Sequence, residues 1–418
     1  MNSIVLEEIN VIGHRLECRY TVKGEWRRYF RDTDTYFAEY GRELEGIPKS
    51  IAVIPFLCNV LPLVWIFNAE VLLEDIDRDF YESIEDFKRG YVNMYPNESF
   101  RGKITARRIT DNNRGDLDGA AVFFSGGVDA YHTLISHIEE KPILVTLWGA
   151  DIPFEDPAGW ELVDQHIQGI AHQNHLEYIP IKTSFRRFLN EVALNEYAFR
   201  LIEDDWWHAF QHGIGIIGHI APLAYQYKIK TVYIASSLTI EDISNCASDP
   251  SIDNYVRFFG CRVIHDGYEY SRPEKTDRIS VYVKKTGKPI QLRVCWESKG
   301  GSNCCHCEKC YRTILCLLAG KNDPREYGFH YREEEFAGMM KDFRIKLHLL
   351  DATYFVVYRS IQNLMRNNYT RQDIIPELRW FYRADLDKEQ SFQKRLLYRF
   401  IRKGKNLLRS KAFKSNLF

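Results

Sequence analysis

Short apolar runs alternate with longer helical stretches through the middle of the chain, and this alternation constrains the fold most. The apolar runs predicted as buried strands are residues 121–124, 143–147, 177–181 and 231–235. The segments between them with helical patterns are residues 128–140, 158–174 and 205–228. Buried strands separated by helices of this length require right-handed crossovers. The pattern therefore predicts an α/β fold with a mostly parallel sheet and flanking helices.

Changes of pattern predict three regions in the 418 residues. Alternating apolar residues over 3–30, followed by an amphipathic helix through Phe80 and Phe87, predict an N-terminal α/β domain at 1–115. Residues 116–320 form the central sheet domain, and 321–418 are predicted to be a helical C-terminal region with a basic tail.

Two features of the sequence indicate where the protein is located in the cell: an apolar stretch and the first residues of the chain. Residues 51–67 are at the lower length limit for a membrane span and are interrupted by Pro55, Asn59 and Pro62, which favours a buried core helix. The first residues lack the basic and apolar segments of a secretory signal, which predicts a cytoplasmic protein.

The segment Phe123–Ala130, Phe-Phe-Ser-Gly-Gly-Val-Asp-Ala, joins the first of these strands to a helix. Its Ser-Gly-Gly permits a tight turn in which successive backbone N–H groups point at one anion, and the following helix adds its positive end. Asp129, in the first helical turn, is placed to hold a magnesium ion between phosphates. An ordinary strand-to-helix turn is the alternative, and a Walker loop is excluded because no Gly-Lys-Ser/Thr follows.

Strand, Ser-Gly-Gly-x-Asp and helix together resemble the pyrophosphate-binding loop of the PP-loop ATP pyrophosphatases, also called adenine nucleotide alpha hydrolases. The resemblance implies cleavage of ATP between its α- and β-phosphates and transfer of AMP to a carbonyl or carboxylate oxygen. The residues that would bind ATP and pyrophosphate are Ser125, Gly126, Gly127, Val128 and Asp129. The family's loop usually ends in Ser, and Ala130 here removes one hydroxyl donor to the pyrophosphate.

Five of the ten cysteines lie within residues 295–310, and such clustering predicts metal binding rather than disulfides. The spacing C-x8-C-x2-C-x2-C supplies four thiolates for one tetrahedral ion: Cys295, Cys304, Cys307 and Cys310. A closed four-sulfur site is typical of structural zinc, with an iron–sulfur cluster as the rival. Cys305 does not fit the spacing and is predicted to be a spare thiol, while Cys295 is expected to end a strand over 291–294.

This spacing, with Arg312 after the last cysteine, resembles 7-cyano-7-deazaguanine synthase, the family that makes the nitrile of the queuosine precursor. The resemblance covers about residues 119–320. The whole chain is more similar to larger deazaguanine-synthase-like proteins with extra domains, some of which serve phage-defence or surface-polysaccharide systems. It implies zinc, ATP and magnesium as cofactors, and a small-molecule or macromolecular acceptor as substrate.

Polar residues that follow the other strands are further site candidates, because ligands of open α/β sheets bind beyond the carboxyl ends of the strands. Asp151 follows the second strand, where a solvated turn aspartate is the alternative, and Thr183 follows the third. The resemblance places the substrate pocket after the fourth strand, where the candidates are Ser236, Ser237, Asp242 and Asp249.

Two further segments carry polar residues with competing interpretations. Ser271 and Glu274 are predicted to form a capping box, and the resemblance also places Arg272 at the mouth of the site as a catalytic residue. Trp206, Trp207, His208 and His212 open a long helix, for which a packed aromatic face is favoured over a site.

The predicted function is an ATP-dependent, carbon–nitrogen-bond-forming ligase that adenylates a carboxylate or amide for attack by ammonia or another amine. The first alternative is a deazaguanine-synthase-like protein of a defence or polysaccharide system that binds nucleotide and modifies or recognises a partner, with the N-terminal domain as a partner surface. The second alternative is a tRNA-modifying thiolase. The acidic body and the zinc-like cysteine spacing disfavour it.

The last 29 residues form a basic tail, with nine Lys and Arg and no acid, while residues 1–389 carry a net charge of −10. Apolar residues recur there at helical spacing among the cations. Such a helix can fold back on the acidic body, pack on an acidic partner or lie on an anionic membrane. Among outside partners the membrane is favoured, and nucleic acid is disfavoured because the apolar residues are mostly bulky aliphatics.

Overall fold

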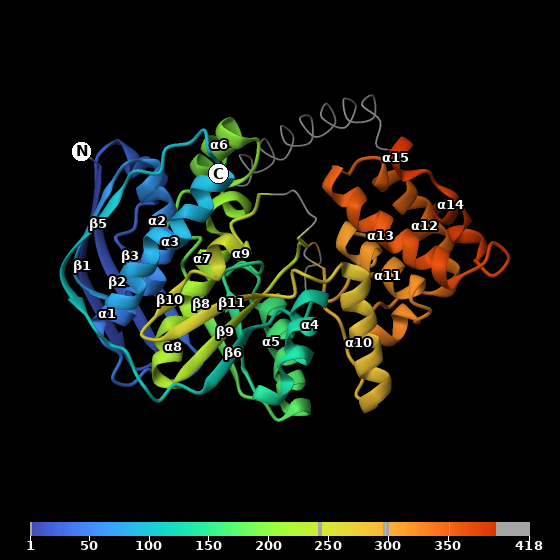
Figure 1. Ribbon diagram of the computed structural model, residues 1–418, viewed down its shortest axis with the longest axis horizontal. Helices are drawn as coiled ribbons and strands as arrows, with labels where there is room; N and C mark the ends of the chain where they lie inside the picture. Colours follow the sequence, from blue (N-terminus) through green and yellow to red (C-terminus); the bar gives the residue numbers. More distant parts are fainter. Residues whose placement is uncertain (1, 241–244, 296, 298–300, 351, 390–418) are drawn as a thin grey trace. The chain divides into compact units, whose positions relative to one another are not determined.

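The computed structural model describes residues 2–240, 245–295, 297, 301–350 and 352–389. These residues belong to two compact units (Figure 1). Of the described residues, the first unit comprises 2–239, 245–269 and 301, and the second comprises 240, 270–295, 297, 302–350 and 352–389.

One sheet of eleven strands runs through the described part of the first unit, in the order β10-β11-β9-β6-β7-β8-β3-β2-β1-β4-β5 (Figure 1). The strands are β1 (Ser3–Ile12), β2 (Arg15–Lys23), β3 (Thr35–Tyr40), β4 (Glu70–Asp77), β5 (Lys103–Thr110), β6 (Gly119–Phe123), β7 (Ile143–Trp148), β8 (Tyr178–Thr183), β9 (Ile229–Ala235), β10 (Arg257–Phe258) and β11 (Cys261–Asp266). Six of the ten strand pairings are parallel. The predicted α/β class with a mostly parallel sheet is confirmed.

The helices of the first unit connect and cover these strands. They are α1 (Lys49–Ala52), α2 (Ile54–Ile66), α3 (Arg78–Met94), α4 (Val128–Ser136), α5 (Pro157–Asn174), α6 (Glu191–Ile202), α7 (His212–Ile217), α8 (Ala221–Gln226) and α9 (Pro250–Asp253), with the short turns η1 (Glu25–Tyr29), η2 (Ile138–Glu140), η3 (Trp207–Gln211) and η4 (Gly218–Ile220). The chain passes from β6 to β7 and β8 on one side, then returns to β9 and β11 on the other side of β6. Right-handed crossovers therefore place α4 and α5 on one face and α7 and α8 on the opposite face.

The N-terminal strands extend the central sheet, so residues 1–115 are not the separate domain predicted. Strand β3 pairs antiparallel with β8, with Ala38 opposite Thr183 and Tyr40 opposite Ile181. Buried hydrogen bonds reinforce this joint, because the hydroxyls of Tyr36 and Thr183 both lie 2.8 Å from Nε2 of His219. Burial lowers the pKa of His219 to about 4, so its ring is neutral and the one lone pair of Nε2 can accept from one of the two hydroxyls.

The apolar stretch at 51–67 lies in this same core. Helices α1 and α2 divide it, and the residues from Ile51 to Trp65 are buried. The prediction of a buried core segment is confirmed. Among the described residues, the structure contains no helix with both the length and the apolar character needed to cross a membrane.

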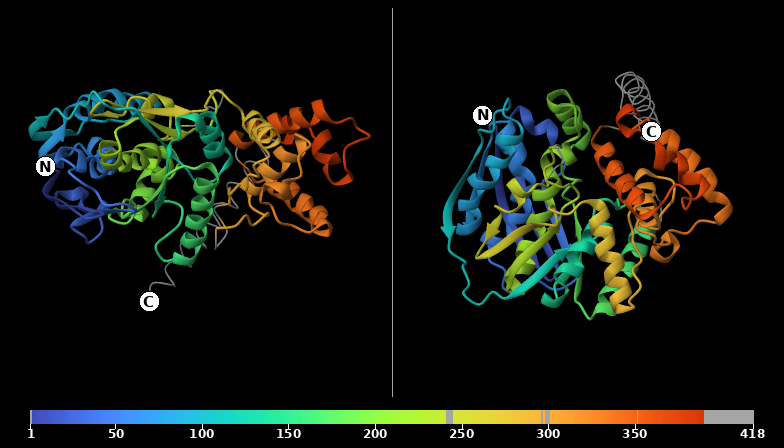
Figure 2. Two further views of the ribbon diagram at one scale, coloured as in Figure 1. Left: turned by 90° about the horizontal axis from the view of Figure 1, so that it is seen from below. Right: turned by 45° about the vertical axis from the view of Figure 1, so that its right-hand side comes forward.

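The second unit is helical (Figure 2). Its elements are α10 (Arg272–Thr286), α11 (Glu308–Ala319), η5 (Pro324–Tyr327), α12 (Glu333–Leu347), α13 (Ala352–Asn368), η6 (Pro376–Leu378), α14 (Arg379–Arg383) and α15 (Leu386–Glu389). The unit starts near Tyr270 and not at the predicted boundary of 321, because α10 and α11 both pack against α13. The basic tail, 390–418, lies outside the described residues.

Candidate functional site

The strand order of the first unit contains a switch point, the kind of position at which open α/β sheets bind ligands. Strands β6 and β9 are neighbours, and the connections that follow them leave toward opposite faces of the sheet. A crevice forms outside the carboxyl ends of strands at such a switch point. The loop 124–127 follows β6 and Ser236 follows β9, so both border this position.

The loop after β6 is a glycine turn that leads directly into α4. The Phe124 N–H donates to the Val145 carbonyl oxygen at 2.8 Å, which ties the start of the loop to β7. Gly126 has φ 79°, a conformation that a side chain disfavours. Gly127 is the N-cap of α4 and has no side chain to occupy the first amides of the helix. Ser125 is exposed, whereas Val128 is buried and fixes the start of α4.

Asp129 and Asp151 lie beyond neighbouring strands, as predicted. Asp129 is half-buried in the first turn of α4, and Asp151 is exposed after β7. Asp151 follows Gly149, which has φ 108°, and a Cβ at Gly149 would lie 2.4 Å from the Thr183 carbonyl oxygen. The sharp turn after β7 therefore requires glycine.

Thr183 has a different role from the one predicted. It is fully buried, and its hydroxyl contacts His219 and accepts from the Phe185 N–H at 3.3 Å. The side chain is committed to the joint with β3 and does not offer its hydroxyl to a nucleotide. Sequence reasoning missed this because it did not anticipate β3 beside β8.

The predicted substrate-pocket residues differ in burial and in hydrogen bonding. Ser236 is buried and donates to the Leu238 carbonyl oxygen at 2.6 Å, while Ser237 is exposed beside it. Asp249 caps α9 by accepting from the Ser251 N–H at 2.8 Å. Asp242 lies outside the described residues. A local structural role therefore accounts for Ser236 and Asp249, whereas the structure shows only that Ser237 is exposed.

Arg272 belongs to the second unit, at the first position of α10. The predicted capping box of Ser271 and Glu274 is confirmed, with the Ser271 N–H donating to the Glu274 carboxylate at 2.7 Å. The Ser271 hydroxyl donates to the same carboxylate, also at 2.7 Å. This box fixes the backbone around Arg272.

The four predicted metal ligands meet in the second unit. Their sulfur atoms all lie within 4.8 Å of one another, with Cys295 and Cys307 at 3.8 Å and Cys304 and Cys310 at 3.9 Å. A tetrahedron with zinc–sulfur bonds of about 2.3 Å has sulfur–sulfur edges of about 3.8 Å. The cluster is therefore compatible with one tetrahedral zinc ion. An iron–sulfur cluster distributes its thiolates over several irons, which such mutual closeness disfavours.

Backbone geometry supports this cysteine site. The N–H groups of His306 and Cys307 approach the sulfur of Cys304 at 3.4 and 3.3 Å, as expected for a knuckle that leads into α11. Hydrogen bonding from Cys310 lowers the pKa of Cys307 to about 5. Cys305 is directed elsewhere, with its sulfur 3.7 Å from the His330 carbonyl oxygen, so its predicted exclusion from the cluster is confirmed.

Sequence reasoning missed Asn303, which joins the two halves of the cysteine site. Its side-chain oxygen accepts from the N–H groups of Val294 and Cys295 at 2.9 and 3.3 Å. Its amide group donates to the carbonyls of Leu292 and Gly328 at 2.7 and 2.9 Å. This side chain holds residues 292–295, where no regular strand of the predicted kind forms, against the knuckle.

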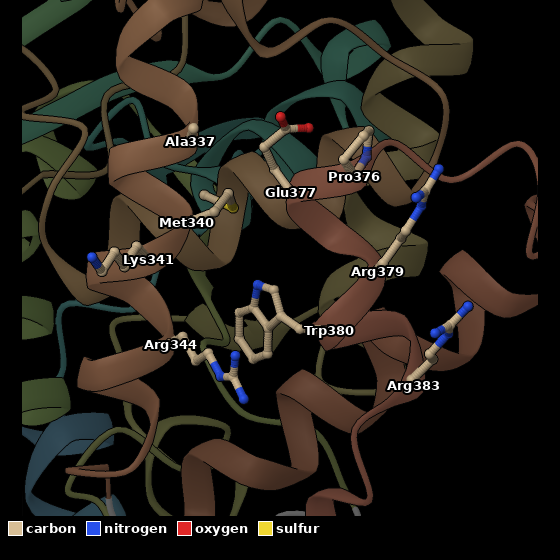
Figure 3. Close-up of a pocket in the computed structure, with 9 residues that line it drawn as sticks. All are labelled: Ala337, Met340, Lys341, Arg344, Pro376, Glu377, Arg379, Trp380 and Arg383. Atoms are coloured by element: carbon tan, nitrogen blue, oxygen red, sulfur yellow. The ribbon is translucent and has the colours of Figure 1, made fainter.

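A basic pocket of about 480 Å³ opens between α12 and the η6–α14 segment (Figure 3). The charged residues and the ring that line it are Lys341, Arg344, Glu377, Arg379, Trp380 and Arg383. The Arg344 guanidinium lies over the Trp380 ring, 5.5 Å from its centre. Four cations against one carboxylate make this pocket suited to anions.

The helix that starts with Trp206 contains both an aromatic core and a polar cluster. Trp206 is buried and packs against Phe210, as predicted. His208 and His212, however, face the thiol of Cys246, and His208 also binds Asp204 at 2.6 Å. The signal available in the sequence was the spacing of Asp204, His208 and His212 at four-residue intervals.

Comparison with known proteins adds no assignment to this geometry. A scan against protein-family models finds no match for the sequence, and a search of curated proteins finds none either.

Proposed function

We propose that this chain is an ATP- and magnesium-dependent adenylating enzyme that resembles 7-cyano-7-deazaguanine synthase and carries a structural zinc ion. The observation that carries the proposal is the turn Ser125–Gly127, with Gly126 at φ 79°, between β6 and α4 at the switch point of the sheet. Backbone amides at such a helix start suit a pyrophosphate group.

In the proposed reaction, a carboxylate oxygen of the acceptor attacks the α-phosphorus of ATP and pyrophosphate leaves. An amine then attacks the activated carbonyl carbon, and AMP leaves with the electron pair of the broken C–O bond. The amides of residues 125–127 would stabilise the charge that develops on pyrophosphate. The Asp129 carboxylate would hold magnesium, whose role is to neutralise phosphate charge.

In this proposal the cysteine site stabilises the fold and takes no part in the reaction. A four-thiolate zinc site has no open position for a substrate, so its contribution is to stabilise the fold. Cys295, Cys304, Cys307 and Cys310 would bind the ion, and the second unit would depend on it.

The test is to incubate purified protein with ATP, magnesium and 7-carboxy-7-deazaguanine and to measure AMP. AMP together with a nitrile or amide product would support the close assignment, and AMP only with another acceptor would support the broader adenylating function. Asp129→Asn is the matched control. Failure to bind ATP and to form AMP with any acceptor would refute the enzyme proposal.

A nucleotide-binding partner protein of a defence or polysaccharide system is the second candidate, and Ala130 favours it. This residue stands where the resembled loops carry a serine, and it is buried in the first turn of α4. Tight ATP binding without turnover, in the presence of acceptor and partner, would distinguish this candidate from the enzyme.

A further inference from the structure

Cys246 lies in a cluster of titratable groups that the proposed adenylation does not use. The thiol is 5% exposed, and three donors surround its sulfur. The Ser248 N–H approaches the sulfur at 3.5 Å, Nδ1 of His212 lies 3.7 Å away, and the His208 side chain interacts electrostatically with the thiol. Several donors around one sulfur stabilise the thiolate form.

His208 is held in place on both sides. Its Nδ1 lies 2.6 Å from a carboxylate oxygen of Asp204, so Nε2 is the ring nitrogen that remains to serve the thiol. Its carbonyl oxygen accepts from the Ala247 N–H at 2.8 Å, which fixes the chain next to Cys246. The residue lies in η3, a π-helical turn, and such turns are frequent at functional sites.

The charges within the cluster are consistent with a thiolate and an imidazolium. Hydrogen bonds to Asp204 and Cys246 raise the pKa of His208 to about 10. Burial opposes ionisation of Cys246, but hydrogen bonds from His208 and His212 outweigh it and lower the thiol pKa to about 6.

The other titratable groups near the cluster are two neutral tyrosines and an aspartate that interacts with His212 rather than with the thiol. Tyr91 of α3 and Tyr95, directly after α3, interact with Cys246, and burial raises the pKa of both above the ordinary tyrosine range. Asp253 of α9 interacts with His212 and is itself hydrogen-bonded to His265 at 2.8 Å.

The cluster also lies near the carboxyl ends of the parallel strands. Trp207 contacts Phe185, which follows β8, with ring centres 5.6 Å apart. The hydroxyl of Ser248, two residues from Cys246, donates to Asp253. Asp253 is hydrogen-bonded to His265, the next-to-last residue of β11. The side chain of His208 is 39% exposed, so the cluster reaches the surface through this residue.

We propose that Cys246 is a nucleophile for activated acyl groups, with His208 as its acid–base partner and Asp204 as the residue that positions His208. The arrangement follows the logic of a nucleophile, a base and an orienting carboxylate. The sulfur attacks the carbonyl carbon, a C–S bond forms, and the C–O bond to the leaving group breaks. The leaving group departs with the electron pair, and attack by water or an amine later releases the thiol.

For the natural donor, the inference rests on the proposed function, because an acyl adenylate is an activated acyl group. The thiolate would displace AMP, and the amine would then attack the thioester. The nucleophile itself can be tested without ATP by using 4-nitrophenyl acetate as the acyl donor.

The first experiment measures acetylation of the Cys246 peptide by mass spectrometry from pH 5.5 to 9.5. The wild-type rate should reach half its maximum below pH 7, instead of near the ordinary thiol value of about 8.5. His208→Gln should lower the rate at pH 6.5 at least 10-fold and recover most of it at pH 9, and Asp204→Asn should shift the profile in the same direction. Cys261→Ala, which removes a buried thiol of β11, is the control and should leave the profile unchanged.

Recovery at high pH separates a role in ionisation from misfolding, because a misfolded variant would not regain the wild-type rate. An unmodified Cys246 at every pH, or an unchanged profile in His208→Gln, would overturn the inference. With ATP, magnesium and 7-carboxy-7-deazaguanine, full product formation by Cys246→Ala would refute the thioester step and leave the proposed function standing. Acetylation of Cys246 in a protein that never forms AMP would refute the proposed function alone.

Discussion

The most direct test of the zinc site is to remove the side chain that supports it without touching a ligand. Asn303→Ala deletes four hydrogen bonds, at 2.7, 2.9, 2.9 and 3.3 Å, that join residues 292–295 and Gly328 to the knuckle. A hydrogen bond contributes about 1 kcal/mol net, and a buried partner left without one costs about 1–3 kcal/mol. Water can reach part of this segment, so we expect a loss of about 2–4 kcal/mol in the free energy of unfolding.

The same substitution should weaken zinc binding, because Cys295 is positioned through its own N–H to Asn303. Loss of an outer partner of a metal ligand typically lowers affinity by about 10- to 100-fold. The measurements are competition with a chromophoric chelator and urea unfolding with zinc or with EDTA. The matched control is Asn322→Ala, which removes a single local hydrogen bond to Gly320 at 3.0 Å and should leave zinc affinity unchanged. Wild-type zinc affinity together with wild-type stability in Asn303→Ala would refute the reasoning.

Three further predictions follow from the loop, the cysteines and the tail. Asp129→Asn should abolish pyrophosphate release and leave the fold intact, because the amide keeps the shape and removes the charge that would hold magnesium; normal turnover would show a helix-end role only. Cys310→Ser should lower zinc content and thermal stability together, whereas Cys305→Ser should change neither, and full zinc in Cys310→Ser would contradict the ligand set. The intact chain should co-sediment with anionic vesicles at low salt and a protein ending at Glu389 should not, since each basic residue near such a surface contributes about 1 kcal/mol; equal behaviour of the two would exclude a membrane role for the tail.

The central strands and the glycine turn between β6 and α4 were predictable because their signals are local. A buried parallel strand is a continuous apolar run, and the loop needs glycine where φ is positive, as it is at Gly126. The cysteine ligands were predictable because one ion requires four thiolates at short spacing. In each case the residues that meet in space are also close in sequence.

The joint between the N-terminal strands and the central sheet was not predictable in this way. It depends on β3 pairing with β8, whose residues are about 145 positions apart, and on polar side chains that look unremarkable alone. Gln211 donates to Asn59 at 2.8 Å and to the Phe185 carbonyl oxygen at 3.1 Å. In the sequence, Gln211 and Asn59 are single amide side chains among mostly apolar residues, and nothing there indicates that they meet. The same holds for Cys246, which is 38 residues from His208 and gains its environment only when the chain folds.

The structure also explains how the loop after β6 is held in one conformation. Asp266, the last residue of β11, accepts from Thr133 at 2.7 Å and lies 3.0 Å from Nε2 of His137 at the end of α4. Burial opposes protonation of His137, but its hydrogen bonds to Asp266 and Glu140 outweigh this and raise its pKa, while the same contacts lower the pKa of Asp266. Helix α4 is thus fixed at its carboxyl end by the contacts of Thr133 and His137 with Asp266, and at its amino end by the buried Val128. Amides fixed in this way need no reorganisation when an anion binds, and this is the condition under which backbone dipoles stabilise developing charge most effectively.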